Sequence, residues 1–335
     1  MTNILYLEPY LGLEPYQRKD AIFFFGREKW QQKISDCLEI NKLTVLYGES
    51  GVGKSSLLQA GIVNRWSLVA EENLKNIGVP EYVVVSFKDW EHKEKLLDYI
   101  KENVAKAMQD SPSVLELEQK IDKIKAEIEA EYREQKYALP SNLFVELKAL
   151  TEIRGGDDYD GHLFIILDQF EAYFQQYTQE DTFTKDFAEV VNSASLKVNF
   201  LIAIRSDEFY KVEKQFKQHI PDAIRNIELP PLNKEEAKQA IEKPIERYNF
   251  IECLRTSRLT VLSGEKGMGK SFILKTGVIP YWRGNQEDKQ NNICNTIFFP
   301  AQQNDWEDEP YTKSVNLVKT SLSSCLEYNT YTQQK

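Results

Sequence analysis

The stretch Leu43–Ser56, "LTVLYGESGVGKSS", constrains the fold of this chain more than any other part of its sequence. A short apolar run ends at Gly48, and Gly48–Ser55 then fits the pattern G-x-x-x-x-G-K-[ST] just before an apolar segment with helical composition. In such a loop the glycines let backbone N–H groups turn toward phosphates, and the start of the following helix adds partial positive charge. We therefore predict a phosphate-binding loop, the P-loop, at Gly48–Ser55. A mere strand-to-helix turn would need the glycines but not the Lys-Ser pair.

The residue types in the P-loop also assign roles within it. Lys54 is expected to reach the β- and γ-phosphates of a nucleotide, and Ser55 offers a hydroxyl to Mg²⁺, an ion that prefers oxygen ligands. The predicted nucleotide contacts in and next to the loop are Gly48, Glu49, Ser50, Gly51, Val52, Gly53, Lys54, Ser55 and Ser56.

Around the P-loop, short apolar runs alternate with amphipathic segments, which is typical of a parallel sheet covered by helices. The predicted strands are 43–47, 82–87, 163–168, 200–205 and 226–230. We therefore expect an α/β fold of the P-loop NTPase class. Residues 113–135 carry apolar side chains at helical spacing and predict one long helix. Its apolar stripe could pack on its own domain or against a partner helix.

A magnesium-nucleotide site also needs a carboxylate at the end of a neighbouring strand, and Asp168 stands there in "LFIILDQFEAYF". Its expected role is to hold Mg²⁺ through water, whereas a helix-capping aspartate is the alternative. Hydrolysis further requires a group that orients the attacking water, and Gln169 and Glu171 are the nearest candidates. Arg205 ends the fourth predicted strand, where it could sense the γ-phosphate or form a surface ion pair with a following acid.

The second notable feature is an internal repeat. "ECLRTSRLTVLSGEKGMGKSFILKTGVI", residues 252–279, aligns without a gap to residues 36–63, and the same offset matches Trp66 with Trp282 and Asp89-Trp90 with Asp305-Trp306. The second copy contains its own loop, Gly264–Ser271, but the chain ends before a second acidic strand. We predict an NTPase domain at 1–248 and a partial, degenerate repeat at 249–335. A second active site, or a fragment of a longer protein, are the alternatives.

Composition excludes several function classes. The formal net charge is −10, which opposes non-specific binding to nucleic acid or anionic membrane. The four cysteines show no metal-ligand spacing, and no run is apolar enough for a spanning helix or a signal peptide. We expect a cytoplasmic protein with no nucleic-acid signature.

Five stretches together resemble the novel STAND NTPases, which belong to the AAA+-like side of the P-loop ATPases. They are "PYLGLEPYQRKDAIFFFGRE" (9–28), the P-loop, "ILDQFEAYF" (166–174), "IAIRSDEFY" (202–210) and "IELPPLNKEEAKQAIEKP" (227–244). The resemblance implies a signalling ATPase that exchanges ADP for ATP, changes shape and often oligomerises to act on an effector, commonly in prokaryotic defence or regulation. It also implies that Gly26 and Arg27 lie near the adenine and ribose, and that Pro230 or Pro231 joins the sheet to a helical lid.

The chain departs from that family in one respect that concerns catalysis. The family's "DQFEE" reads Asp168-Gln169-Phe170-Glu171-Ala172 here, so one acid is missing, and many related ATPases carry Glu where Gln169 stands. Two hypotheses follow. The chain is a slow ATPase switch that uses ATP, ADP and Mg²⁺ and engages a protein partner or further copies of itself, or it is a nucleotide-binding scaffold without turnover. A phosphotransferase is a third class, without a visible acceptor signature.

Overall fold

The computed structural model describes residues 8–77, 82–107, 114–154, 161–177, 182–220 and 224–256. Nearly all of these belong to one compact unit, Met1–Glu252. The second P-loop at Gly264–Ser271 and the rest of the predicted repeat lie outside the described residues, so the domain division at 248 stays a prediction. A helix, α10 (Lys234–Thr256), runs through that position.

A five-stranded parallel sheet forms the centre of the unit, in the order β2-β3-β4-β1-β5. The strands are β1 (Leu43–Gly48), β2 (Tyr82–Phe87), β3 (His162–Leu167), β4 (Val198–Arg205) and β5 (Ile224–Glu228). Each predicted strand is present, with ends displaced by up to two residues. The displacement at β5 has a physical reason, because this edge strand exposes Arg225 and Asn226 and so lacks an apolar signal at its start.

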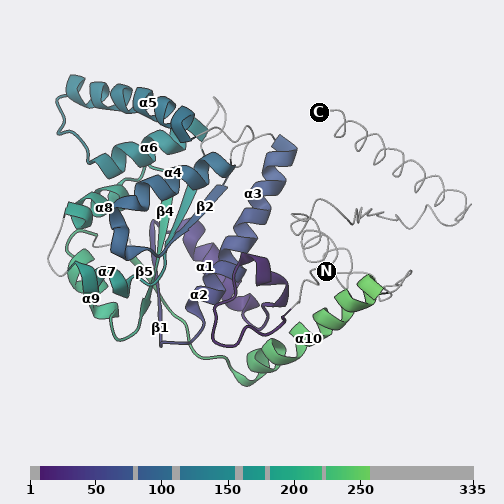
Figure 1. The fold of residues 1–335 in the computed structure, drawn as a ribbon. Coiled ribbons are helices and arrows are strands. Elements are labelled where there is room, and N and C mark those ends of the chain that lie inside the picture. Colours follow the sequence, from purple (N-terminus) through teal and green to yellow (C-terminus); the bar gives the residue numbers. More distant parts are fainter. Residues whose placement is uncertain are drawn as a thin grey trace, which may run out of the picture. The chain divides into compact units, whose positions relative to one another are not determined.

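Helices cover both faces of the sheet, which confirms the predicted α/β fold (Figure 1). The helical segments before β2 are η1 (Arg18–Phe23), α1 (Glu28–Ile40), α2 (Lys54–Ser56), η2 (Leu57–Val63) and α3 (Asn64–Ile77). Those between β2 and β3 are η3 (Trp90–Lys95), α4 (Leu96–Ala107), α5 (Val114–Glu134) and α6 (Asn142–Arg154). The remaining ones are α7 (Glu171–Gln176), α8 (Thr182–Asn192), α9 (Phe209–Phe216) and α10.

The alternation of side chains along each strand divides the core into two clusters. In β3, Leu163, Ile165 and Leu167 face the cluster that includes residues of α4, α5, α6, α8 and α9. Phe164 and Ile166 face the opposite cluster, formed with α1, η2 and α3. Because β3 is buried on both faces, its sequence is a continuous apolar run, as expected for a central parallel strand.

The long helix predicted at 113–135 is α5, and it packs within its own domain. Leu117, Ile121 and Ile128 are at most 3% exposed and belong to the larger core cluster. Charged side chains add a second connection, because Glu146 of α6 pairs with Lys125 of α5 at 2.7 Å and with Lys101 of α4 at 3.3 Å. One buried carboxylate thus joins three helices.

Of the helices that the structure describes, none combines the length and apolar character that a membrane span requires.

We predict that Glu146→Ala lowers the free energy of unfolding by about 3–5 kcal/mol, because it leaves two lysines without their buried counter-charge. Glu129→Ala is the control, since it breaks the exposed Arg133–Glu129 pair and is expected to cost less than about 1 kcal/mol. Urea unfolding monitored by circular dichroism measures both. Equal losses in the two variants would contradict the prediction.

Candidate functional site

The P-loop follows β1 directly and leads into the continuous helical run α2, η2 and α3. Gly53 adopts φ +95°, a left-handed conformation that favours glycine, and caps the first turn through its carbonyl, which accepts the N–H of Leu57. Glu49, Ser50 and Gly51 are exposed at the tip. The loop therefore has the strand-loop-helix context that phosphate binding requires.

Lys54 folds back over the P-loop. Its Nζ donates to the carbonyl of Gly48 at 2.7 Å and to that of Glu49 at 2.9 Å. Burial lowers the pKa of Lys54, whereas the nearby carboxylates of Glu171 and Asp168 act in the opposite direction. The ammonium is thus held above the loop and close to both acids.

Asp168 follows β3 and meets the P-loop across the intervening strand β4. It is 2% exposed, and its carboxylate accepts a hydrogen bond from the N–H of Gln169 at 2.9 Å. Burial raises the pKa of Asp168, while the nearby Ser55 hydroxyl, the Gln169 N–H and the charges of Lys88 and Lys54 act in the opposite direction. The structure therefore brings Asp168 close to Lys54 and Ser55, although it lies far from them in the sequence.

These groups fit a magnesium ion. The Ser55 hydroxyl and the Asp168 carboxylate are hard oxygen donors that lie near each other, and Mg²⁺ is usually held by one or two such groups together with water and phosphate oxygens. A carboxylate this buried gains most from a nearby cation, because it is otherwise poorly solvated.

The two candidates for orienting water differ in their surroundings. Gln169 is exposed and adopts φ +53°, which is uncommon for a residue with a side chain. Glu171 begins α7, and its Oε2 atom is buried without a hydrogen-bond partner among the described residues. Glu171 also lies close enough to Lys54 to affect its pKa. The free acceptor of Glu171 makes it the better placed of the two to bind a water near the phosphates.

Arg205 forms the ion pair that was one of the two alternatives left open by the sequence. It pairs in register with Gly48, the first residue of the P-loop, so it lies beside the loop. Its guanidinium also makes two hydrogen bonds to Asp207, at 3.0 and 2.6 Å. A role in sensing the γ-phosphate stays a prediction, and it would require Arg205 to exchange this partner.

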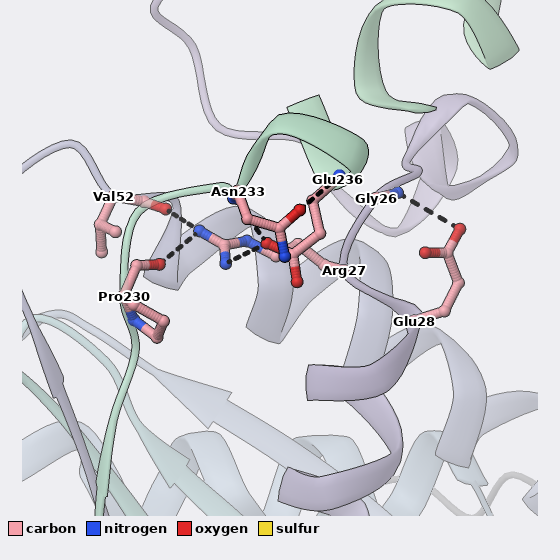
Figure 2. A network of polar contacts seen from close by, with 7 residues as sticks. All are labelled: Gly26, Arg27, Glu28, Val52, Pro230, Asn233 and Glu236. Carbon is pink, nitrogen blue, oxygen red and sulfur yellow. Dashed lines mark hydrogen bonds and ion pairs between the residues drawn. The ribbon is translucent and has the colours of Figure 1, made fainter. Parts of the chain in front are cut away.

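Arg27 connects the P-loop with the start of α10 (Figure 2). The residue is 4% exposed, and its Nη2 donates to the carbonyls of Val52 at 3.1 Å and Pro230 at 2.9 Å. Its Nη1 lies 3.7 Å from the carboxylate of Glu236. These protein partners occupy the guanidinium, and contact of Arg27 with adenine or ribose stays a prediction.

Gly26 allows α10 to approach this arginine closely. It has φ +85°, and a Cβ at this position would lie 2.4 Å from the carbonyl oxygen of Glu236. The first turn of α10 is fixed by a capping box, in which the N–H groups of Asn233 and Glu236 each donate to the other residue's side chain at 2.9 Å (Figure 2). Gly26 therefore serves helix packing in this structure.

Ser56, the last predicted nucleotide contact, faces the segment before α1. Its Oγ accepts the N–H of Tyr16 at 3.2 Å. Three further residues near the site were not among the predicted site residues: Lys88, Trp90 and Glu236. Lys88 and Trp90 could have been predicted, because both closely follow β2, whose carboxyl end borders the site.

We predict that Asp168→Asn raises the unfolding temperature of the nucleotide-free protein at pH 7. Because the pKa of Asp168 is raised in the folded state, the ionised carboxylate costs stability at pH values above that pKa. The difference from wild type is expected to shrink as the pH falls, since protonation removes the same charge. Thermal unfolding in EDTA at several pH values measures it, with the exposed Asp122→Asn as control. A lower unfolding temperature for Asp168→Asn at pH 7 would contradict the prediction.

We also predict that Arg27→Ala lowers the free energy of unfolding by about 2–4 kcal/mol, because the buried guanidinium is lost and two partly buried carbonyls and one carboxylate lose their partner. Arg18→Ala breaks only the exposed ion pair with Glu71 and is expected to cost less than about 1 kcal/mol. Denaturant unfolding of both variants checks the difference, and a loss for Arg27→Ala as small as that for Arg18→Ala would refute it.

A sequence model of the family described as novel STAND NTPase 1 matches residues 9–251. The match includes the P-loop, Asp168, Arg205 and the capping box of α10. A search of curated proteins found no match.

Solved structures to which this chain is similar include a Walker-type ATPase, an ORC2 protein and Cdc6p, all at low identity. The Walker-type ATPase of Pyrococcus abyssi is 18% identical, with a TM-score of 0.38, and the alignment covers 75% of this chain and 63% of that one. The ORC2 protein of Aeropyrum pernix in its ADP form is 15% identical, with a TM-score of 0.39, at 73% and 55% coverage. Cdc6p from Pyrobaculum aerophilum is 13% identical, with a TM-score of 0.34, at 67% and 49% coverage. This chain spans less than two thirds of each.

Proposed function

Because the chain belongs to the novel STAND NTPase 1 family, we propose that it binds ATP or ADP with Mg²⁺ at the P-loop and hydrolyses ATP slowly. The observation that carries this proposal is that the buried carboxylate of Asp168 lies beside Ser55 and Lys54 of the P-loop. A helix cap or a packing turn would not need these three groups in one place.

The chain's own residues supply most of the proposed chemistry. Backbone N–H groups of the P-loop bind the phosphates, and Lys54 balances charge on the β- and γ-phosphates. Ser55 and Asp168 would hold Mg²⁺, which neutralises charge that develops on the phosphate oxygens. Glu171 orients the attacking water through its unpartnered Oε2. Turnover is slow in this proposal because Gln169, which cannot act as a base, follows Asp168.

The same site would act as a signalling switch, as family membership suggests. Arg27 supports this proposal, because it joins the P-loop carbonyl of Val52 to the start of α10. A change in the loop on nucleotide exchange would alter the position of α10 and so the surface offered to a protein partner or to further copies of the chain. Prokaryotic defence or regulation and a cytoplasmic location stay predictions from the sequence.

A nucleotide-binding scaffold without turnover is the second candidate. The residue that directly follows Asp168 is the exposed Gln169 and not a carboxylate, and this favours the scaffold. The two candidates share the binding site and differ only in phosphate release.

We predict that steady-state phosphate release by the wild type exceeds that of Lys54→Ala and Asp168→Ala by about 100-fold, since each variant removes charge stabilisation at the phosphates. Lys270→Ala is a matched control, because it makes the same change in the second loop, which we propose is not an active site. It is expected to leave the rate within about twofold of the wild type. A colorimetric phosphate assay on the full chain measures all four proteins.

The outcomes separate the hypotheses. Release by the wild type no greater than by Lys54→Ala would refute hydrolysis and leave the scaffold, provided that a titration shows nucleotide binding. Loss of release in Lys270→Ala, with retention in Lys54→Ala, would move the active site to the second loop.

A further inference from the structure

Trp90 holds the backbone of Asp168. The residue begins η3, just after β2, and its indole Nε1 donates to the main-chain carbonyl of Asp168 at 2.7 Å. The indole is 1% exposed, so this hydrogen bond is shielded from water. We propose that Trp90 is a positioning residue for the magnesium-binding carboxylate of Asp168, an inference that rests on the nucleotide site proposed above.

One peptide group transmits the effect. The carbonyl that Trp90 holds belongs to the peptide that joins Asp168 to Gln169, and the N–H of that same peptide donates to Asp168 Oδ1 at 2.9 Å. Because a peptide group is planar, fixing its oxygen also fixes the direction of its N–H. The indole therefore sets the orientation of the donor that holds the carboxylate, although it does not touch the carboxylate itself.

The peptide needs this support because the chain turns sharply there. Gln169 adopts φ +53°, a left-handed conformation that is unfavourable for a residue with a side chain. The turn is pinned on both sides, since the N–H of Asp168 donates to Phe87 of β2 and the N–H of Phe170 donates to Ala203 of β4. The Asp168 carbonyl lies between these two bonded N–H groups, and it accepts the hydrogen bond of the Trp90 indole.

Trp90 is itself held rigidly by aromatic packing. Its ring meets that of Phe87 at 5.2 Å and that of Phe170 at 4.8 Å, both nearly perpendicular, and that of Tyr173 at 5.7 Å. Phe87 and Phe170 also flank the turn, so ring packing and hydrogen bonding fix the same few residues. An ordinary core tryptophan would need the packing but not the bond to this carbonyl.

The chain offers a matched control in Trp66. It is 7% exposed and packs against Tyr82 and Phe164 in the core cluster on the other face of the sheet. Its Nε1 makes no hydrogen bond to the described residues. Trp66→Phe therefore removes the same atoms from a core position without removing a bond near Asp168.

The test measures the affinity of the full chain for AMPPNP in Mg²⁺ and in EDTA by calorimetry. The ratio of the two dissociation constants, here called the magnesium increment, reports on the magnesium-binding groups separately from the phosphate-binding loop. We expect Trp90→Phe to reduce this increment by about 3- to 10-fold, the size of one hydrogen bond, and to leave the affinity in EDTA within about twofold of the wild type. Trp66→Phe is expected to change neither.

Four results would overturn the inference or its premise. An unchanged increment in Trp90→Phe, or an equal loss of affinity in Mg²⁺ and EDTA, would show that Trp90 serves packing alone. A wild type that binds no AMPPNP, or binds it without a magnesium increment, would instead refute the proposed nucleotide site. If Trp90→Phe does not fold, benzothienylalanine at position 90 replaces it, because this isostere keeps the ring and lacks only the N–H.

Discussion

The pairing of parallel strands is the constraint on which the rest of this site depends. Because all five strands run in the same direction, the ends of β1, β2, β3 and β4 meet at one edge of the sheet. The P-loop follows β1, and Asp168 follows β3. The proximity of Ser55 to Asp168 therefore follows from the strand order and requires no long loop to reach across.

The sequence was sufficient for the parts of the site that depend on local pattern. Strands β1 to β5, the long helix α5 and the P-loop each have a signal within a few residues, either apolar periodicity or glycine spacing. Asp168 could also be predicted, because a carboxylate directly after a buried strand is easily recognised. The end of β3 was placed one residue too late, since Asp168 still donates its N–H to Phe87 as a strand residue would.

The remaining contacts could not be predicted because they join segments that are distant in sequence. Arg27 bonds to the carbonyls of Val52 and Pro230, and backbone carbonyls have no signature in the sequence. The bond of Trp90 could not be predicted for the same reason. A tryptophan after a strand indicates only a core residue, whereas its indole N–H donates to the backbone carbonyl of Asp168. The left-handed conformation of Gln169 could not be predicted, because residues other than glycine and asparagine rarely adopt it.

The two halves of the site are held in different ways, and this difference bears on how a switch would work. Asp168 is fixed by hydrogen bonds to Phe87 of β2 and to the indole of Trp90, and the N–H of nearby Phe170 donates to Ala203 of β4. The P-loop is exposed at its tip, and Val52 is tied through Arg27 to the first turn of α10. A movement of the loop would therefore reach α10 through one guanidinium, whereas the carboxylate of Asp168 would keep its place. In the switch proposed above, such a division would let nucleotide exchange change the outside of the domain without dismantling the site.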